Sequence, residues 1–98
     1  MSDTLHFRWG ITQGQHILSR QFGEQYAIYL RGSGDTHLLH SAGFFILHAL
    51  DSGPHSFKEL LDMLSAEYEF SSAEQSQEFL NSIILEFQKL SIIQRFDT

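Results

Sequence analysis

Six histidines are the side chains of this chain whose type could most readily do chemistry. Histidine is a common zinc ligand and a frequent general base. His37 and His40 stand three residues apart, and His48 and His55 follow at wider intervals. Because residues three apart on a strand point to opposite sides, and no acid sits at a recognisable ligand spacing, the pattern favours ordinary surface histidines over a metal site.

Motifs for nucleophilic catalysis and for phosphate binding are also missing. Gly32, Ser33 and Gly34 lie between two expected strands instead of opening a helix, so they do not form a phosphate-binding loop. No set of Ser, His and acid stands at a known spacing. The absence of cysteine excludes a disulfide framework, a thiolate zinc cluster and a cysteine nucleophile. We therefore predict a non-enzyme that needs no metal and no cofactor.

Length and charge narrow the class of protein further. The 98 residues suffice for one domain, spanning 1–98, and not for two. The whole net charge of −6 lies in residues 51–98, which hold three cations against nine acids. No apolar stretch approaches the ~20 residues that cross a bilayer, and the N-terminus lacks the pattern of a signal peptide. We expect a cytoplasmic protein with no membrane partner.

The first forty residues show the period-two patterning of strands. Three antiparallel strands are expected at 16–22, 26–30 and 36–39, separated by turns that contain glycine. Phe7, Trp9 and Ile11 alternate in the same way ahead of them, as a lead-in. The N-terminal part is therefore predicted to be a sheet.

Three helices are expected after these strands. Residues 42–50 are apolar nearly all round, with Ser41 as the expected N-cap, so this helix must be central. A capping box at residues 56–59 predicts the start of the second helix, and another at residues 71–74 predicts a third helix that runs to about residue 90. Residues 92–96 allow one short final strand. The order predicts an α+β, winged helix-turn-helix-like domain with three N-terminal antiparallel strands followed by three helices.

A winged-helix order raises the hypothesis of DNA binding by the third helix. Nucleic-acid affinity depends largely on Lys and Arg that neutralise phosphates. The expected third helix carries Glu74, Glu78 and Glu86 against Lys89 alone. Charge therefore makes DNA binding the weakest hypothesis, and we expect no nucleic-acid partner.

Three segments resemble the PqqD family. They are the Gly-Asp-Thr-His-Leu-Leu run at residues 34–39, the Phe-Arg-Trp run at 7–9, and the Ser-Phe-Lys-Glu-Leu-Leu run at 56–61. The first two are similar to the branch found in the HPr-related A system, and the resemblance covers about residues 7–93. It implies three antiparallel strands packed on three helices, in a peptide chaperone or precursor-peptide recognition element. One departure is His40, where the family commonly has Asn.

The resemblance also implies where a peptide would bind. It would add as a strand beside residues 36–39, in the groove between that strand and the third helix. On a helical wheel, the third helix has an apolar stripe that consists of Phe79, Leu80, Ile83, Ile84, Phe87 and Leu90. The border of this stripe that bears Leu80 and Ile84 merges into polar residues, as expected of a groove wall. The expected peptide-binding residues are Thr36, His37, Leu38, Leu39, Gln77, Leu80, Ile84 and Gln88. Leu80 and Ile84 have ordinary core packing as their alternative, and Leu85 is either a lone exposed residue or part of a partner surface.

Two functions of different classes remain. The first is a non-catalytic adaptor that binds the leader of a ribosomally made precursor peptide and presents it to a modifying enzyme. The acidic helical half then predicts a peptide that is apolar with some basic residues. The alternative is a structural or regulatory subunit that docks on an HPr-kinase-like protein through its helices. Exposed strand edges also allow an edge-paired or domain-swapped homodimer.

Overall fold

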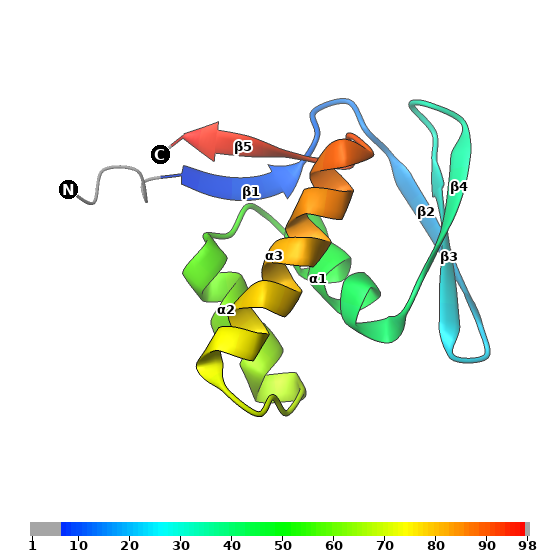
Figure 1. Cartoon of the computed structure of the whole chain (residues 1–98). Helices are drawn as coiled ribbons and strands as arrows, with labels where there is room; N and C mark the ends of the chain where they lie inside the picture. The colour runs from blue at the N-terminus through cyan, green and yellow to red at the C-terminus, as the bar shows by residue number, and fades with distance from the viewer. Residues whose placement is uncertain (1–6, 98) are drawn as a thin grey trace.

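The computed structural model describes residues 7–97. Figure 1 shows the order of the elements along the chain. They are β1 (Phe7–Ile11), β2 (Ile17–Phe22), β3 (Gln25–Leu30), β4 (Asp35–Leu39), α1 (Ser41–Asp51), α2 (Phe57–Glu67), α3 (Ala73–Lys89) and β5 (Ile93–Asp97). None of the helices within this range is both long and apolar enough to cross a membrane.

The strands form two antiparallel sheets. The larger has the order β2-β3-β4, and the smaller pairs β1 with β5. A two-residue turn joins β2 to β3, and its first residue, Gly23, has a φ of 59°, which L side chains adopt only with strain. The α+β class, with three antiparallel strands before three helices, is thereby confirmed. The expected lead-in at 7–11 is a strand as well, and its partner is the chain's own C-terminal strand. A winged helix-turn-helix likeness is compatible with this order and stays a prediction.

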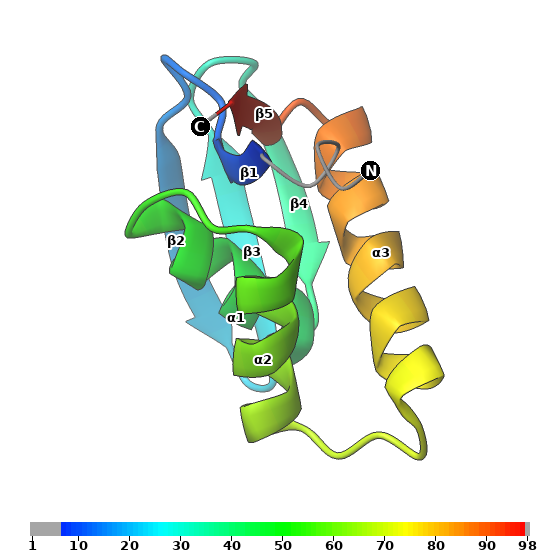
Figure 2. The ribbon, with the colours of Figure 1, turned by 90° about the vertical axis from the view of Figure 1, so that its left-hand side faces the viewer.

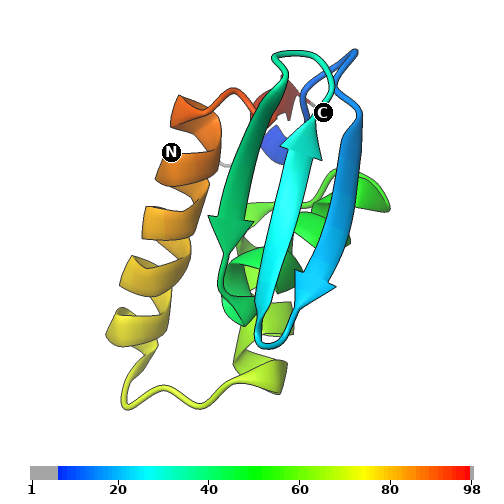
Figure 3. The ribbon, with the colours of Figure 1, turned by 90° about the vertical axis from the view of Figure 1, so that its right-hand side faces the viewer.

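All three helices lie on one side of the larger sheet, as Figures 2 and 3 show from opposite directions. The opposite face of that sheet is turned toward the viewer in Figure 3 with no helix over it. In the same two views α3 runs beside β4, the edge strand nearest to it. The expected central helix, α1, contacts β1, β3 and β4 on one side and α2 on the other.

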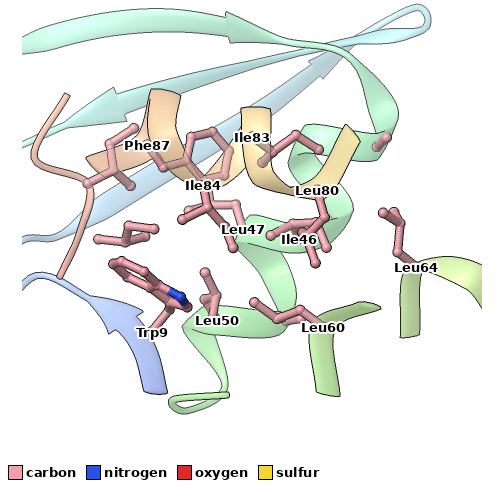
Figure 4. Close-up of a cluster of buried hydrophobic side chains, with 14 of the residues drawn as sticks. Trp9, Ile46, Leu47, Leu50, Leu60, Leu64, Leu80, Ile83, Ile84 and Phe87 are labelled. Carbon is pink, nitrogen blue, oxygen red and sulfur yellow. The ribbon is translucent and has the colours of Figure 1, made fainter. Parts of the chain in front are cut away.

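The core forms where these layers meet (Figure 4). Strand β3 contributes Ile28 and Leu30, α1 contributes Ile46, and all three side chains are at most 1% exposed. The other fully buried large side chains are Leu50, Leu60, Leu64, Leu80, Phe87 and Ile92. Trp9 closes the core from β1, whose backbone exchanges two hydrogen bonds with His55. Nearly all of the buried side chains are apolar, as the patterning of the sequence predicts.

One of the three expected helix starts is confirmed. Ser56 Oγ accepts a hydrogen bond from the backbone N–H of Glu59 at 3.1 Å, and Glu59 Oε1 accepts one from the Ser56 N–H at 3.0 Å. This is the reciprocal capping box expected for α2.

The other two expected starts are wrong by one residue. The N-cap of α1 is His40 and not Ser41. The N-cap of α3 is Ser72, whose Oγ accepts from the Gln75 N–H at 3.1 Å, so the box expected at residues 71–74 is displaced. Both segments place two capping residues side by side, and the incoming loop or strand decides which of the two takes the cap.

Candidate functional site

A groove of about 380 Å³ lies between β4 and α3. Its apolar floor consists of Leu39 from β4 and of the buried Ile83 and Phe87 from α3. Its full lining is Leu38, Leu39, His40, Gly43, Ser82, Ile83, Glu86 and Phe87. The exposed side chains among these, which include Leu38 and Glu86, form the two rims. The groove therefore has an apolar floor and rims that carry both apolar and polar side chains.

The backbone of β4 is paired on one side only, with β3, within residues 7–97. The bond from the Arg31 N–H to the His16 carbonyl shows which residues of β3 point toward β2. Along an antiparallel strand, the backbone N–H and C=O groups of successive residues point to opposite sides. Those of Tyr26, Ile28 and Leu30 in β3 therefore bond to β4. Their register partners on β4 are Leu39, His37 and Asp35. The N–H and C=O groups of the two residues between them, Thr36 and Leu38, are therefore directed to the open edge. These two donors and two acceptors are what an added strand would use.

The end of the groove beside the start of α1 is shaped by His40 and Gly43. His40 Nδ1 accepts a hydrogen bond from the Gly43 N–H at 3.1 Å, which caps α1. The imidazole also lies 6.0 Å from the ring of Phe79 on α3, so it bridges the strand side and the helix side. Gly43 leaves room there, since a methyl group at this position would meet Leu39 and His40 at ordinary contact distances of 3.6–3.8 Å.

Some of the eight expected peptide-binding residues lie on the groove or its strand, and the others lie elsewhere on α3. Leu38 and Leu39 line the groove, and Thr36 and His37 precede them on the same strand. Leu80 and Ile84 are core residues, 0% and 2% exposed, and do not line the groove. Gln77 and Gln88 are exposed on α3 outside the groove lining.

The helical wall of the groove is the other border of the same apolar stripe. Ser82, Ile83, Glu86 and Phe87 line it, and none of the four is among the peptide-binding residues expected from the sequence. The signal was present, because Ile83 and Phe87 belong to the stripe and Ser82 and Glu86 lie next to it on the wheel. The apolar stripe has two borders, and the position of β4 decides which of them lies beside this strand. Leu85, 56% exposed, lies outside the stripe and the groove.

Glu86 is the single acid in the groove lining. No nitrogen of a Lys, Arg or His within residues 7–97 comes within 4.0 Å of its carboxylate. The same range contains no group of three side chains that could hold a metal ion. The groove thus offers backbone hydrogen bonds, apolar contact and one negative charge.

A second exposed surface is the uncovered face of the larger sheet, which we call the outer face. It carries four large apolar side chains that are 41–63% exposed: Leu18, Phe22, Tyr29 and Leu38. In the register of the sheet, Tyr29 stands between Leu18 and Thr36, and Ala27 stands between Arg20 and Leu38. A shallow hollow of about 390 Å³ lies over this face. Clustered apolar exposure of this kind is typical of protein contact surfaces.

Comparison with known proteins gives one informative likeness. No protein-family model matches the chain, and no curated protein matches it either. Among solved structures the chain is similar to the protein described as TbiB1 in complex with the TbiA(beta) leader peptide, with a TM-score of 0.69 and 16% identity. The likeness covers 87% of this chain and 94% of that one. At this identity it shows a shared fold, so this chain has the fold of a protein solved with a bound leader peptide.

Proposed function

We propose that this protein is a non-catalytic adaptor that binds the leader of a ribosomally made precursor peptide and presents it to a modifying enzyme. The peptide adds as a strand to β4 and fills the groove beside α3. The observation that carries the proposal is the open edge at Thr36 and Leu38, directly beside a groove with an apolar floor. The shared fold with a protein solved with a leader peptide supports it. In this proposal residues 1–98 form one PqqD-like domain of the HPr-related A branch and act in the cytoplasm.

The energetics of such a complex require both parts of the site. Four backbone hydrogen bonds at a net ~0.5–1.5 kcal/mol each contribute about 2–6 kcal/mol. Micromolar binding needs about 8 kcal/mol after the entropy of association has been offset. Apolar side chains contribute about 1.5–3 kcal/mol each when fully buried, so several of them, including those seated on Ile83 and Phe87, must add to the backbone bonds. Edge pairing alone would be too weak, and the groove is what makes strand addition stable.

A proline at Leu38 tests the open edge. Its ring removes the N–H that points away from β3, and it leaves the ladder bonds of His37 and Leu39 in place. We expect Leu38→Pro to stay folded and to lose binding of the precursor peptides encoded beside the gene. The measurement is fluorescence anisotropy with labelled peptides, together with amide NMR shifts of the 15N-labelled protein.

Two variants serve as matched controls. Ser19→Pro removes an outward donor from the opposite edge strand, β2, by the same alternation, and should leave peptide binding unchanged. Leu38→Ala removes the side chain and keeps the N–H, so it separates the two contributions of this residue. Peptide binding with amide shifts that spare both β4 and α3, or full binding by Leu38→Pro, would refute strand addition here.

The outer face favours a second candidate function, a subunit that docks on a partner protein. The alternative interpretation of the sequence placed docking on an HPr-kinase-like protein through the helices. Leu18, Phe22 and Tyr29 point instead to the sheet face as the surface available for it. Leu18→Lys with Phe22→Lys would abolish pull-down of that neighbour and leave peptide binding intact if docking uses this face. Unchanged pull-down by the double variant would exclude it.

A further inference from the structure

We propose that Glu86 is a specificity-determining residue of the groove, which selects peptides carrying a Lys or Arg beside two apolar residues. The inference rests on the proposed function and adds the chemical class of the peptide. It comes from the position of one acidic side chain on the border of an apolar groove.

The spacing of the groove floor sets the apolar part of the pattern. Ile83 and Phe87 are four residues apart on α3, which is about 6 Å along the helix axis. Alternate residues of an extended peptide are about 6.7 Å apart and point to the same side. A strand running along β4 would therefore place the side chains at positions i and i+2 against Ile83 and Phe87. Ile83 and Phe87 are at most 6% exposed, and their side chains offer apolar contact and nothing polar.

The negative charge on the rim of the groove determines the charged residue of the peptide pattern. Glu86 is exposed, adjoins Phe87 in the chain, and has no cationic partner within 4.0 Å among residues 7–97. A bound peptide would displace water from its carboxylate, and a carboxylate that loses water without gaining a partner is costly. A long Lys or Arg side chain near the paired apolar residues can reach the rim while its aliphatic part covers the floor.

The same carboxylate discriminates against the wrong peptides. An acidic peptide residue at this place would meet a like charge, so Glu86 would reject it as well as favour a cation. The C-terminal half of the chain has the same sign of charge as Glu86, because residues 51–98 carry the entire net charge of −6. The only other titratable side chain in the groove lining is His40, whose Nδ1 is engaged with the Gly43 N–H.

Selection from a random 12-residue peptide library displayed on phage tests the proposal. The library is panned separately on the whole wild-type protein, on Glu86→Lys and on the control Glu78→Lys. Glu78 is exposed on the same helix, outside the groove lining. We expect wild type and Glu78→Lys to enrich Lys and Arg beside an apolar-x-apolar pair, and Glu86→Lys to enrich Asp and Glu there.

Affinities of the best peptide complete the test. Replacing its basic residue by Gln should weaken binding about fivefold, the size expected of one partly exposed ion pair. Glu86→Gln should weaken the original peptide by the same factor and leave the Gln peptide unaffected, since both changes remove one interaction. If the two changes together weaken binding by the product of their separate factors, Glu86 and the basic residue act independently, and direct pairing between them is refuted.

Failure of this inference is distinguishable from failure of the proposed function. Enriched peptides that shift the amides of β4 but show no basic preference, or a preference unchanged in Glu86→Lys, would refute the role of Glu86 alone. If no enriched peptide shifts the β4 or α3 amides, the strand-addition proposal fails, and the inference about Glu86 fails with it.

Discussion

His40 Nδ1 and the backbone N–H of Gly43 are joined by a 3.1 Å hydrogen bond that starts α1 directly after β4 ends. His40 is therefore the N-cap of α1. Asn is among the best N-cap residues because its side-chain oxygen accepts from the first turn, and His40 supplies a ring nitrogen for the same purpose. The imidazole additionally lies over the groove beside Phe79.

Replacing His40 separates its two roles. His40→Ala loses the cap acceptor and should lower the free energy of unfolding by about 1 kcal/mol, measured by urea denaturation. His40→Asn should retain most of that stability, because the amide oxygen can accept from the Gly43 N–H. Equal stability of His40→Ala and wild type would show that the hydrogen bond contributes nothing to the fold.

Gly43→Ala should raise stability and weaken peptide binding at once. Gly43 is helical, and a Cβ there meets its neighbours at ordinary contact distances, so Ala removes backbone entropy from the unfolded state at little steric cost. The expected gain is up to about 1 kcal/mol in unfolding free energy. The added methyl group stands beside Leu39 and His40 in the groove lining and narrows it. Thermal denaturation and peptide titration of the same sample check both parts, and tighter peptide binding by the variant would contradict the second.

Two leucines of α3 differ sharply in what their removal should cost. Leu80 is 0% exposed and Leu85 is 56% exposed. Leu80→Ala leaves a cavity in the core and should cost about 2–5 kcal/mol of unfolding free energy. Leu85→Ala, the matched control, should change it by no more than about 0.5 kcal/mol. Chemical denaturation of the two variants measures the difference, and similar costs would place Leu80 outside the core.

The capping box of α2 makes the stability of the fold depend on pH in the acidic range. The hydrogen bond from the Ser56 N–H holds the pKa of Glu59 below its ordinary value, and Arg8 at 3.7 Å and His55 at 3.4 Å act in the same direction. A carboxylate with a lowered pKa in the folded state stabilises the fold above its unfolded pKa, and this contribution is lost as pH falls through the folded value.

We therefore expect stability to decline below about pH 4.3, the ordinary value for Glu, and Glu59→Gln to lack this component. An amide oxygen can still accept from the Ser56 N–H and does not titrate, so this variant isolates the ionisation. Carbon-13 NMR of the Glu59 carboxyl group gives its pKa directly. A value at or above that of an unstructured peptide would contradict the prediction.

Local patterning in the sequence was sufficient for the elements themselves. Period-two alternation located β2, β3 and β4, helical spacing located α1, α2 and α3, and Ser56 with Glu59 marked the start of α2. These signals come from neighbours in the chain, because the side-chain period and the cap depend on the backbone within one or two turns. The fold class followed from the order of the elements.

Only the tertiary structure decided which border of α3 faces β4. Leu80 and Ile84 have the same periodicity as Ile83 and Phe87, yet the first pair is core outside the groove and the second pair is the helical part of its floor. The pairing of β1 with β5, from opposite ends of the described chain, was equally beyond local signals. A helical stripe specifies a buried face, whereas the rotation of that face about the helix axis depends on contacts distant in the sequence.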